Sequence, residues 1–580
     1  MLGWCGKIAE INLSAGECKT FSPDPEILLK FIGGKGLAGY FLKEHVTLDW
    51  DDPDMPLLLF TGPLVNTRSP TSGRMTVMSR SPSTGTVGDS SVGGYFGTEL
   101  KKAGFDGIII RGKSDGLCGI EIDDGKIKIA PASHMAGMPV SLARSLLKDK
   151  GSQAVIGPAA ENGVLFSNII FDGHFAAGRN GLGLILALKK IKYITARGTK
   201  KTKISDPEEL DKARKDIFRL VSASPVLSGN YGISKFGTAA LYDLMDARRM
   251  MPADNFRKSF FSNARLMNAP SLKKIYRPKD RGCRGCHILC KKVTGDGTIM
   301  PEFETLSHFS ALIGNTDIET VVSANRICNE TGMDTISAAA TLSCFSEISG
   351  KTFTPSYILD LLNDIAYKRN EGEKLGEGAA RYAKMTGHPE SAITVKGQEL
   401  PAYDPRGAYG MALSYAVSTR GGCHLRAYPV SHEILRKPVA TDRFTFEGKA
   451  RIIKTSEDLN AVVDSLTACK FIFFAASPEE YSKVFHAVTG INFSGQDLIK
   501  TGERIYYNER IMNAANGFSA KDDDLPARFF NSFGHKGEKI TIGPIDREDF
   551  LRARANYYKA RGLDEDGIPL PEIAKKLGLY

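Results

Sequence analysis

Apolar and polar residues alternate with a period of two in several short segments of the first 200 residues. In residues 120–122 and 126–129 isoleucines occupy every second position, and the Asp-Asp-Gly between them at 123–125 is a turn signal. This pattern predicts a β-hairpin with one buried face. The Ser-Ala-Gly at 14–16 predicts a second hairpin, and the uninterrupted apolar run at 107–110 predicts a fully buried strand.

The periodicity changes to that of a helix after a polar, basic stretch at residues 196–203. Asp206 is a predicted N-cap, and Pro207 suits the first helical position. The apolar residues that follow have three- and four-residue spacing: Leu210, Ala213, Ile217 and Leu220. The same spacing recurs over 452–466 and over 498–512, so two further helices are predicted there.

These changes divide the chain into three predicted domains, with a second soft boundary at residues 396–401. Residues 1–200 form a β-rich N-terminal domain. Residues 201–397 and 398–580 form two mainly helical domains. The predicted fold class is therefore α+β, and no internal repeat of fixed period is visible.

The composition, with 42% hydrophobic and 24% charged residues in a chain of 580, is that of a large globular protein. The formal net charge of +10 is dispersed, which disfavours nucleic-acid binding. A mild positive field suits an anionic cofactor or an acidic electron-carrier protein. The N-terminal segment has no apolar signal core and no stretch is long enough to span a bilayer, so we expect a cytoplasmic protein.

Three of the ten cysteines fall within residues 283–290, in a C-x2-C-x3-C element. Three thiolates from one turn suit an iron–sulfur cubane better than zinc, although zinc remains an alternative. A fourth ligand is needed, and the spacing does not select it. The candidates are Cys328, Cys344, Cys423 and Cys469.

Glycine-dense turns at 33–39, 93–97 and 178–183 permit close approach of the backbone to a bulky ligand. None has the Walker or Rossmann context. Arg74 and Arg179 lie beside such turns, and from the residues alone they are either phosphate ligands or ordinary structural arginines. Glu304 and His424 are either a proton-transfer pair or, respectively, a helix-capping residue and an interior histidine.

Taken together, these segments resemble the tungsten-containing aldehyde ferredoxin oxidoreductase family over the whole chain. Specific blocks of that family are matched in order at residues 4–7, 33–39, 62–64, 93–100, 172–179, 301–304, 400–407, 420–424 and 561–567. The resemblance implies a β-rich base on which two pterin dithiolenes hold tungsten, closed over by two helical domains. The sequence does not separate tungsten from molybdenum, because the dithiolene ligands belong to the cofactor.

The resemblance also implies the site residues. A [4Fe-4S] cluster is implied at Cys283, Cys286, Cys290 and Cys469. Pterin contacts are implied at Arg74, Gly93, Arg179, Asp334 and Asp464, with Mg²⁺ at the pterin phosphates. The two pterin segments, 329–334 and 464–469, depart from the family pattern at Asn329, Met333, Thr467 and Ala468.

The implied reaction is oxidation of a small-molecule aldehyde to a carboxylic acid with water. Glu304 then assists the attack of water, and His424 hydrogen-bonds the carbonyl oxygen. Two electrons leave singly to ferredoxin or to an iron–sulfur electron-transfer subunit, in an anaerobic setting. Two rival interpretations are a related tungsten enzyme acting on an aromatic thioester and a non-catalytic iron–sulfur or zinc subunit.

The implied assembly is a homodimer or a hetero-oligomer. Some relatives bridge a dimer with a metal held by a Glu-x-x-His helix. The corresponding segment, 322–326, has serine and arginine instead, so a metal-bridged dimer is not expected.

Overall fold

Two six-stranded sheets form the N-terminal part of the chain in the computed structural model, which describes residues 1–580. The first sheet has the order β2 (Glu17–Phe21), β1 (Ile8–Asn12), β6 (Gly107–Arg111), β3 (Leu57–Phe60), β4 (Met75–Arg80) and β5 (Val87–Val92). The second sheet has the order β11 (Phe175–Ala177), β10 (Ile169–Phe171), β9 (Ser152–Ile156), β12 (Ile191–Arg197), β7 (Cys118–Asp123) and β8 (Lys126–Pro131). Pairing is parallel between β1 and β6 and between β7 and β12, and antiparallel elsewhere in the two sheets.

The three strand and hairpin predictions made for this part are confirmed. Strands β7 and β8 form the expected hairpin, with Ile120 opposite Ile129 and Ile122 opposite Ile127. Strands β1 and β2 form the second hairpin around residues 14–16. The apolar run at 107–110 lies in β6, which pairs on both edges and is buried.

Strand β3, inside the first sheet, is apolar on both of its faces. Leu57 and Leu59 contribute to the apolar core between the two sheets. Leu58 and Phe60 point the other way, into a larger core shared with the helices. Because both faces of this strand are buried, polar residues do not alternate with apolar ones along it, and its sequence is continuously apolar.

The helical part begins at α7 (Pro207–Ala223), ten residues after the end of β12 at Arg197. The Asp206 carboxylate accepts hydrogen bonds from the backbone N–H groups of Glu208 and Glu209, so the predicted N-cap is confirmed. The helices predicted at 452–466 and 498–512 are α21 (Lys449–Leu466) and α23 (Gly495–Ala515). The predicted α+β class is therefore confirmed.

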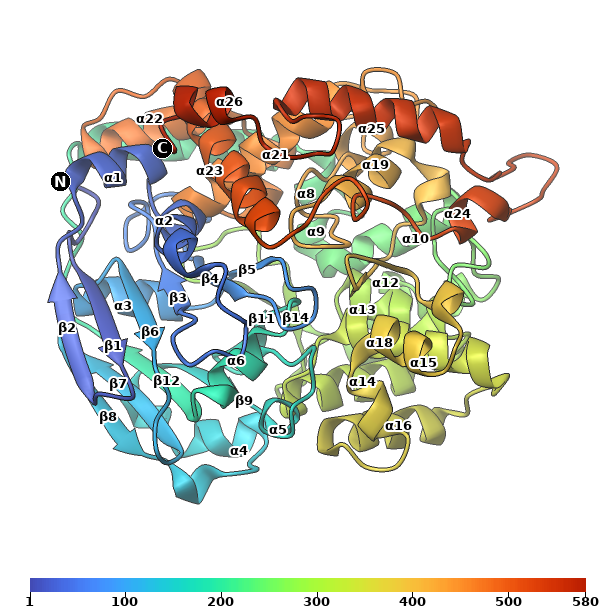
Figure 1. Cartoon of the computed structure of the whole chain (residues 1–580), viewed down its shortest axis with the longest axis horizontal. Helices are drawn as coiled ribbons and strands as arrows, with labels where there is room; N and C mark the ends of the chain where they lie inside the picture. The colour runs from blue at the N-terminus through green and yellow to red at the C-terminus, as the bar shows by residue number, and fades with distance from the viewer.

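Figure 1 shows the β-rich part on the left, one group of helices at the lower right and the C-terminal helices along the top. The lower group contains α14 (Ile318–Thr331), α15 (Thr335–Ser349), α16 (Pro355–Tyr367) and α18 (Gly378–Met385). The upper group contains α21, α22 (Pro478–Thr489), α23, α25 (Arg547–Arg561) and α26 (Pro571–Lys576). None of the helices combines the length and the apolar composition that a membrane span requires. The division of the helical part at residue 397 remains a prediction.

Candidate active site

Four cysteines from two distant segments lie together beside the first sheet. The loop between β13 (Lys279–Arg281) and β14 (Lys291–Val293) carries three of them: Cys283, Cys286 and Cys290. The fourth, Cys469, follows α21, and its backbone N–H donates to the Thr71 carbonyl over 3.1 Å. All four are free thiols and half-buried, so the chain brings four potential soft ligands to a place just beneath its surface.

Gly93, at the end of β5, lies against both Cys283 and Arg74. A Cβ atom on Gly93 would lie 2.4 Å from the Cys283 Sγ and 3.3 Å from the Arg74 Nη1. The cysteine loop is fixed at the same turn, because the backbone N–H of Arg284 donates to the Gly94 carbonyl over 3.1 Å. Three of the predicted site residues therefore meet at one point.

The thiols affect one another through their charges. Burial raises the pKa of Cys286 to about 11, and the negative charges of Cys469 and Cys283 add to this effect. Burial also raises the pKa of Cys469, against the opposing influence of Arg74. In this conformation no group of three or more His, Cys, Asp or Glu side chains is arranged to hold a metal ion. Positively charged iron would remove the repulsion between neighbouring thiolates.

The other candidates for a fourth thiol lie elsewhere. Cys328 and Cys344 are fully buried within α14 and α15. The Cys423 Sγ accepts hydrogen bonds from the Arg420 guanidinium over 3.0 and 3.1 Å. Only Cys469 lies beside the cysteine loop.

Asp464, near the end of α21, places a carboxylate against the first sheet. Its Oδ2 lies 2.8 Å from the Lys470 Nζ, whereas its Oδ1 is buried without a hydrogen-bond partner. Glycine is required for this close packing. A Cβ on Gly34 would lie 2.3 Å from the Asp464 carbonyl oxygen, and one on Gly62 would lie 2.7 Å from that of Ser465.

Asp334 occupies the corresponding position against the second sheet. It caps α15, and its Oδ2 accepts a hydrogen bond from the Ser337 N–H over 3.1 Å and lies 3.5 Å from the Arg179 Nε. Beside it, the Ser167 Oγ and the Asn168 Oδ1 are buried without partners. Each sheet therefore receives one carboxylate from the helical part, with unpartnered polar atoms next to it.

The two predicted phosphate-binding arginines are held by the protein itself. Arg74 donates to the Ser91 Oγ over 3.0 Å and to the Ser91 carbonyl. Arg179 donates to the carbonyls of Glu399 and Gly422. The structure thus brings Arg74 to the cysteines and Arg179 to Asp334, with both guanidinium groups engaged by main-chain oxygens.

Glu304 and His424 are adjacent, although 120 positions separate them in the sequence. Glu304 lies in the first turn of α13 (Phe303–Ser307), and its Oε2 accepts a hydrogen bond from the Ala402 N–H over 2.7 Å. The His424 Nε2 lies 3.4 Å from the Glu304 Oε1. The Glu304 Oε1 and the His424 Nδ1 are both buried without hydrogen-bond partners, so this pair has free atoms for a ligand.

Burial sets the protonation of this pair. It raises the pKa of Glu304 to about 8, against the opposing effects of the Ala402 hydrogen bond and of Arg179. It lowers the pKa of His424 well below its ordinary value, and the positive charges of Arg179 and Arg420 act in the same direction. The imidazole is therefore uncharged near pH 7, and the Glu304 carboxyl gains and loses its proton at a pH close to neutral.

Sequence reasoning did not single out His308 or Tyr403, which also face this pair. His308 lies one turn after Glu304, in a π-helical turn, and is fully buried with its Nε2 3.1 Å from the Leu400 carbonyl oxygen. Its Nδ1 has no partner. The Tyr403 ring centroid lies 5.4 Å from that of His424. The four-residue spacing of Glu304 and His308 was the available signal.

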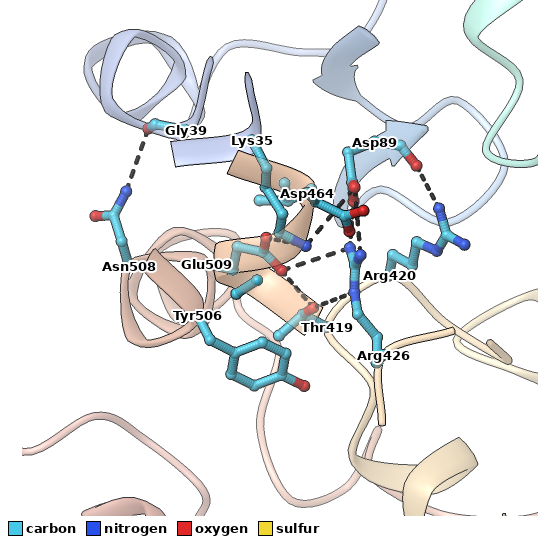
Figure 2. A network of polar contacts seen from close by, with 12 residues as sticks. Lys35, Gly39, Asp89, Thr419, Arg420, Arg426, Asp464, Tyr506, Asn508 and Glu509 are labelled. Atoms are coloured by element: carbon cyan, nitrogen blue, oxygen red, sulfur yellow. Dashed lines mark hydrogen bonds and ion pairs between the residues drawn. The ribbon is translucent and has the colours of Figure 1, made fainter. Parts of the chain in front are cut away.

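A buried charge cluster, made of Lys35, Asp89, Arg426 and Glu509, fixes the loop that carries His424 (Figure 2). The Lys35 Nζ lies 2.6 Å from the Glu509 Oε1 and 3.6 Å from the Asp89 Oδ2. Arg426 forms an ion pair with Asp89 and lies 3.4 Å from Glu509. The cluster joins β5, α2 (Gly34–Leu42) and α23 to the loop.

Residues on both sides of His424 connect to this cluster. Thr419 donates to the Glu509 carboxylate over 2.6 Å and accepts from the Arg426 Nε over 3.0 Å, and Arg420 donates to the Asp89 carbonyl (Figure 2). These contacts are directional and largely exclude solvent. The loop is therefore fixed from both ends, and His424 with it.

The buried unpartnered atoms test whether a polar cofactor fits between the sheets and the helices. Such atoms occur throughout the protein, and those that belong to the site residues and their neighbours are the Asp464 Oδ1, the Ser167 Oγ, the Asn168 Oδ1, the Glu304 Oε1 and the His424 Nδ1. Buried polar groups in folded proteins nearly always have hydrogen-bond partners, so such a set indicates a polar ligand. A pterin, with its ring nitrogens and its phosphate, supplies partners of this kind, and the four thiols suit an iron–sulfur cluster. The residues fit both groups.

The fold is a two-sheet base capped by helices, and it carries four cysteines beside a polar interior site. This combination defines a class of redox enzymes. Residues 8–198 match the family model described as the aldehyde ferredoxin oxidoreductase N-terminal domain. Residues 212–579 match the model described as domains 2 and 3 of the same family. The chain belongs to the aldehyde ferredoxin oxidoreductase family, an oxidoreductase enzyme family whose members contain a tungsten–pterin cofactor.

Relatives cover the whole chain. It is 36% identical to the tungsten-containing aldehyde ferredoxin oxidoreductase of Thermococcus kodakarensis and 35% identical to that of Pyrococcus furiosus, over 100% of this chain and 99% of each relative. It is 27% identical to a WOR-like subunit of an aliphatic sulfonate oxidoreductase of P. furiosus, covering 97% of it. The active-site complex BamBC of benzoyl coenzyme A reductase shares the fold, with a TM-score of 0.87 at 21% identity, over 100% of this chain and 97% of that one.

Proposed function

We propose that this protein oxidises aldehydes to carboxylic acids. An aldehyde and one water molecule give one carboxylic acid, two protons and two electrons, and the electrons pass singly to ferredoxin or a similar carrier. The observation that carries the proposal is the pair formed by Glu304 and His424, whose free atoms face the same polar interior. Full-length relatives named for this activity support it.

The residues that would hold the redox groups are those that the chain brings together. Cys283, Cys286, Cys290 and Cys469 would hold a [4Fe-4S] cluster. Asp334, Asp464, Gly93, Arg74 and Arg179 would hold the two pterins, with Mg²⁺ at their phosphates. When bound, the tungsten–pterin group supplies a two-electron acceptor, a role that molybdenum also serves, and no protein side chain replaces it.

The protein side chains supply the proton chemistry. A carboxylate with a raised pKa is a strong base near neutral pH, so Glu304 accepts a proton at its Oε1 from the water that attacks the carbonyl carbon. His424 is neutral and donates a hydrogen bond to the carbonyl oxygen, where negative charge develops. The backbone N–H of Ala402 holds the Glu304 carboxylate in position.

Analysis of protein purified without oxygen tests the proposal. About four irons, one tungsten and pterin per chain are expected, and a panel of aldehydes should reduce benzyl viologen. Glu304→Gln keeps the shape of the side chain but removes the base, so the variant should retain its metals and lose turnover. Zinc alone, with no pterin in several matured preparations, would overturn the proposal in favour of a non-catalytic subunit.

A further inference from the structure

The segment that carries the cysteine loop is surrounded by unpaired positive charge. We define the cationic rim as its six exposed cations: Lys273, Lys274, Arg277, Lys279, Arg281 and Arg284. None of the six forms an ion pair within the chain, whereas the two remaining cations of this segment do. Lys291 lies 2.8 Å from Glu302, and Lys292 lies 2.7 Å from Asp280.

Exposed cations elsewhere on the protein include paired ones, such as Arg547, which lies 2.5 Å from Asp524, and Arg197, which forms an ion pair with Asp123. They also include many unpaired ones. The rim differs in its density, because all six of its unpaired cations fall within residues 273–284. Within residues 273–284 the only acid is Asp280, and that carboxylate is already paired with Lys292; Asp317 and Glu319 lie close enough to act on Tyr276, but neither forms an ion pair with the rim. Six like charges close in sequence repel one another, so their concentration here disfavours the isolated protein and favours an anionic partner.

Leu289 adds an exposed apolar side chain beside the rim, where its Cδ2 lies against Gly282, the residue after Arg281. It lies next to Cys290 with φ at +52°, a region that glycine occupies readily and that leucine rarely adopts. Its side chain is 37% exposed, while that of its neighbour Ile288 is buried. Specific protein interfaces commonly combine an apolar centre with a polar rim.

We propose that Leu289 and the cationic rim form the docking surface for a small acidic electron-carrier protein. This inference rests on the proposed function, because it presumes that electrons leave at the cysteine loop. The half-buried thiols lie within the same segment, where Cys290 forms a β-bridge with Arg281 and Cys283 directly precedes Arg284, so a carrier docked here comes close to them. The charge selects an acidic partner, and the exposed leucine gives the contact an apolar anchor.

A charge-reversal variant tests the rim. Lys274→Glu, Arg277→Glu and Lys279→Glu are combined in one chain, and the probe is a small acidic ferredoxin with two [4Fe-4S] clusters. The matched control reverses three exposed, unpaired lysines far along the second sheet: Lys126, Lys128 and Lys148. Binding is measured directly by calorimetry at low and high salt, alongside ferredoxin-coupled and benzyl viologen-coupled turnover.

The rim variant should bind ferredoxin at least about tenfold more weakly at low salt, with a smaller salt dependence, and kcat/KM for ferredoxin should fall in parallel. The control variant should match the wild type. Viologen-coupled turnover of the rim variant should not fall, because the dicationic dye is no longer repelled by the three reversed cations. Unchanged ferredoxin affinity in the rim variant, an equal loss in the control, or tighter binding of a single-stranded oligonucleotide than of ferredoxin would overturn the inference.

Leu289→Gly supplies a second test that does not depend on charge. Glycine suits φ of +52°, so the variant should keep its iron content and its thermal midpoint while its affinity for ferredoxin falls. Unchanged affinity for ferredoxin would show that Leu289 is not part of the docking surface. If wild-type protein fails to oxidise any aldehyde with viologen, the proposed function fails instead, and calorimetry with ferredoxin still reports on docking.

Discussion

Arg426 is the side chain whose loss perturbs the buried charge cluster most. Its Nη1 lies 3.3 Å from the Asp89 Oδ2, and its Nη2 lies 3.4 Å from Glu509. The side chains of all three residues are at most 2% exposed. Arg426→Met keeps much of the volume but removes one positive charge. Lys35 is then the only side chain that forms ion pairs with the two carboxylates, since Arg420 contacts the Asp89 carbonyl and not its carboxylate, so one buried negative charge loses its direct partner.

The free-energy cost of leaving that charge unpaired can be estimated, and the cost of protonating the carboxyl sets its upper limit. Removing one partner of a buried ion pair costs about 3 to 5 kcal/mol. The protein escapes the cost by protonating Asp89, and for a carboxyl with an unfolded pKa of about 3.9 this takes about 4 kcal/mol at pH 7. We therefore expect a loss of about 3 to 4 kcal/mol at pH 7 and of about 2 kcal/mol at pH 5.5, where protonation is easier.

The direction of this pH dependence follows from the pKa of Asp89 in the wild type and in the Arg426→Met variant. In the wild type burial tends to raise it, but Arg426 and Lys35 hold it well below its usual range. The stability this contributes is fully present above the unfolded pKa, and it is lost only as the pH falls below about 4. Between pH 5.5 and 7 the wild-type contribution is constant, so the change with pH comes from the variant.

Midpoints of anaerobic thermal unfolding test the prediction at both pH values. The variant should unfold at a lower temperature than the wild type at pH 7, and the difference should shrink at pH 5.5. Adding Asp89→Asn to Arg426→Met restores charge balance, so the double variant should lie closer to the wild type. Equal midpoints for wild type and Arg426→Met at pH 7, or no rescue by Asp89→Asn, would refute the reasoning.

Three shorter predictions follow. Gly93→Ala places a Cβ 2.4 Å from the Cys283 Sγ, so iron per chain should fall sharply while the circular dichroism spectrum stays native; full iron content would contradict the packing. Glu304→Gln should lower kcat/KM by about a hundredfold or more, and wild-type kcat/KM should rise with pH up to about 8 as the carboxyl loses its proton; a flat profile would remove Glu304 as the base. Asp206→Ala should cost about 1 kcal/mol of stability by removing a helix cap and leave kcat unchanged; an unaltered unfolding midpoint would contradict the cap.

Local patterns predicted the elements well because each depends on residues close in sequence. The isoleucine alternation at 120–129 and the Asp206 cap need only the pleat of a strand and the free N–H groups of a helix end. The C-x2-C-x3-C element likewise brought three thiols into one predicted loop, since they fall within eight residues and lie between β13 and β14. Such signals do not depend on the rest of the fold.

Contacts between distant segments were not predictable in this way. Spacing alone did not choose Cys469 from the four candidates, because its nearness to the cysteine loop depends on how the residues after α21 pack against Thr71. The charge cluster was missed for the same reason. Lys35 and Glu509 are 474 positions apart, and each alone is an ordinary charged residue. Only the packing of α2 against α23 joins them.

The charge cluster positions the loop that carries His424, and this role, rather than a gain in stability, explains why so many charges are buried there. A buried ion pair adds little net stability over apolar packing, but its hydrogen bonds fix direction. Arg426→Lys separates the two effects, because it keeps the charge and loses the planar fork that contacts Asp89 and Thr419 together. Its unfolding midpoint should lie nearer the wild type than that of Arg426→Met, while kcat falls as the His424 loop loses its fixed position. A lysine variant with full kcat would show instead that charge balance alone holds the loop.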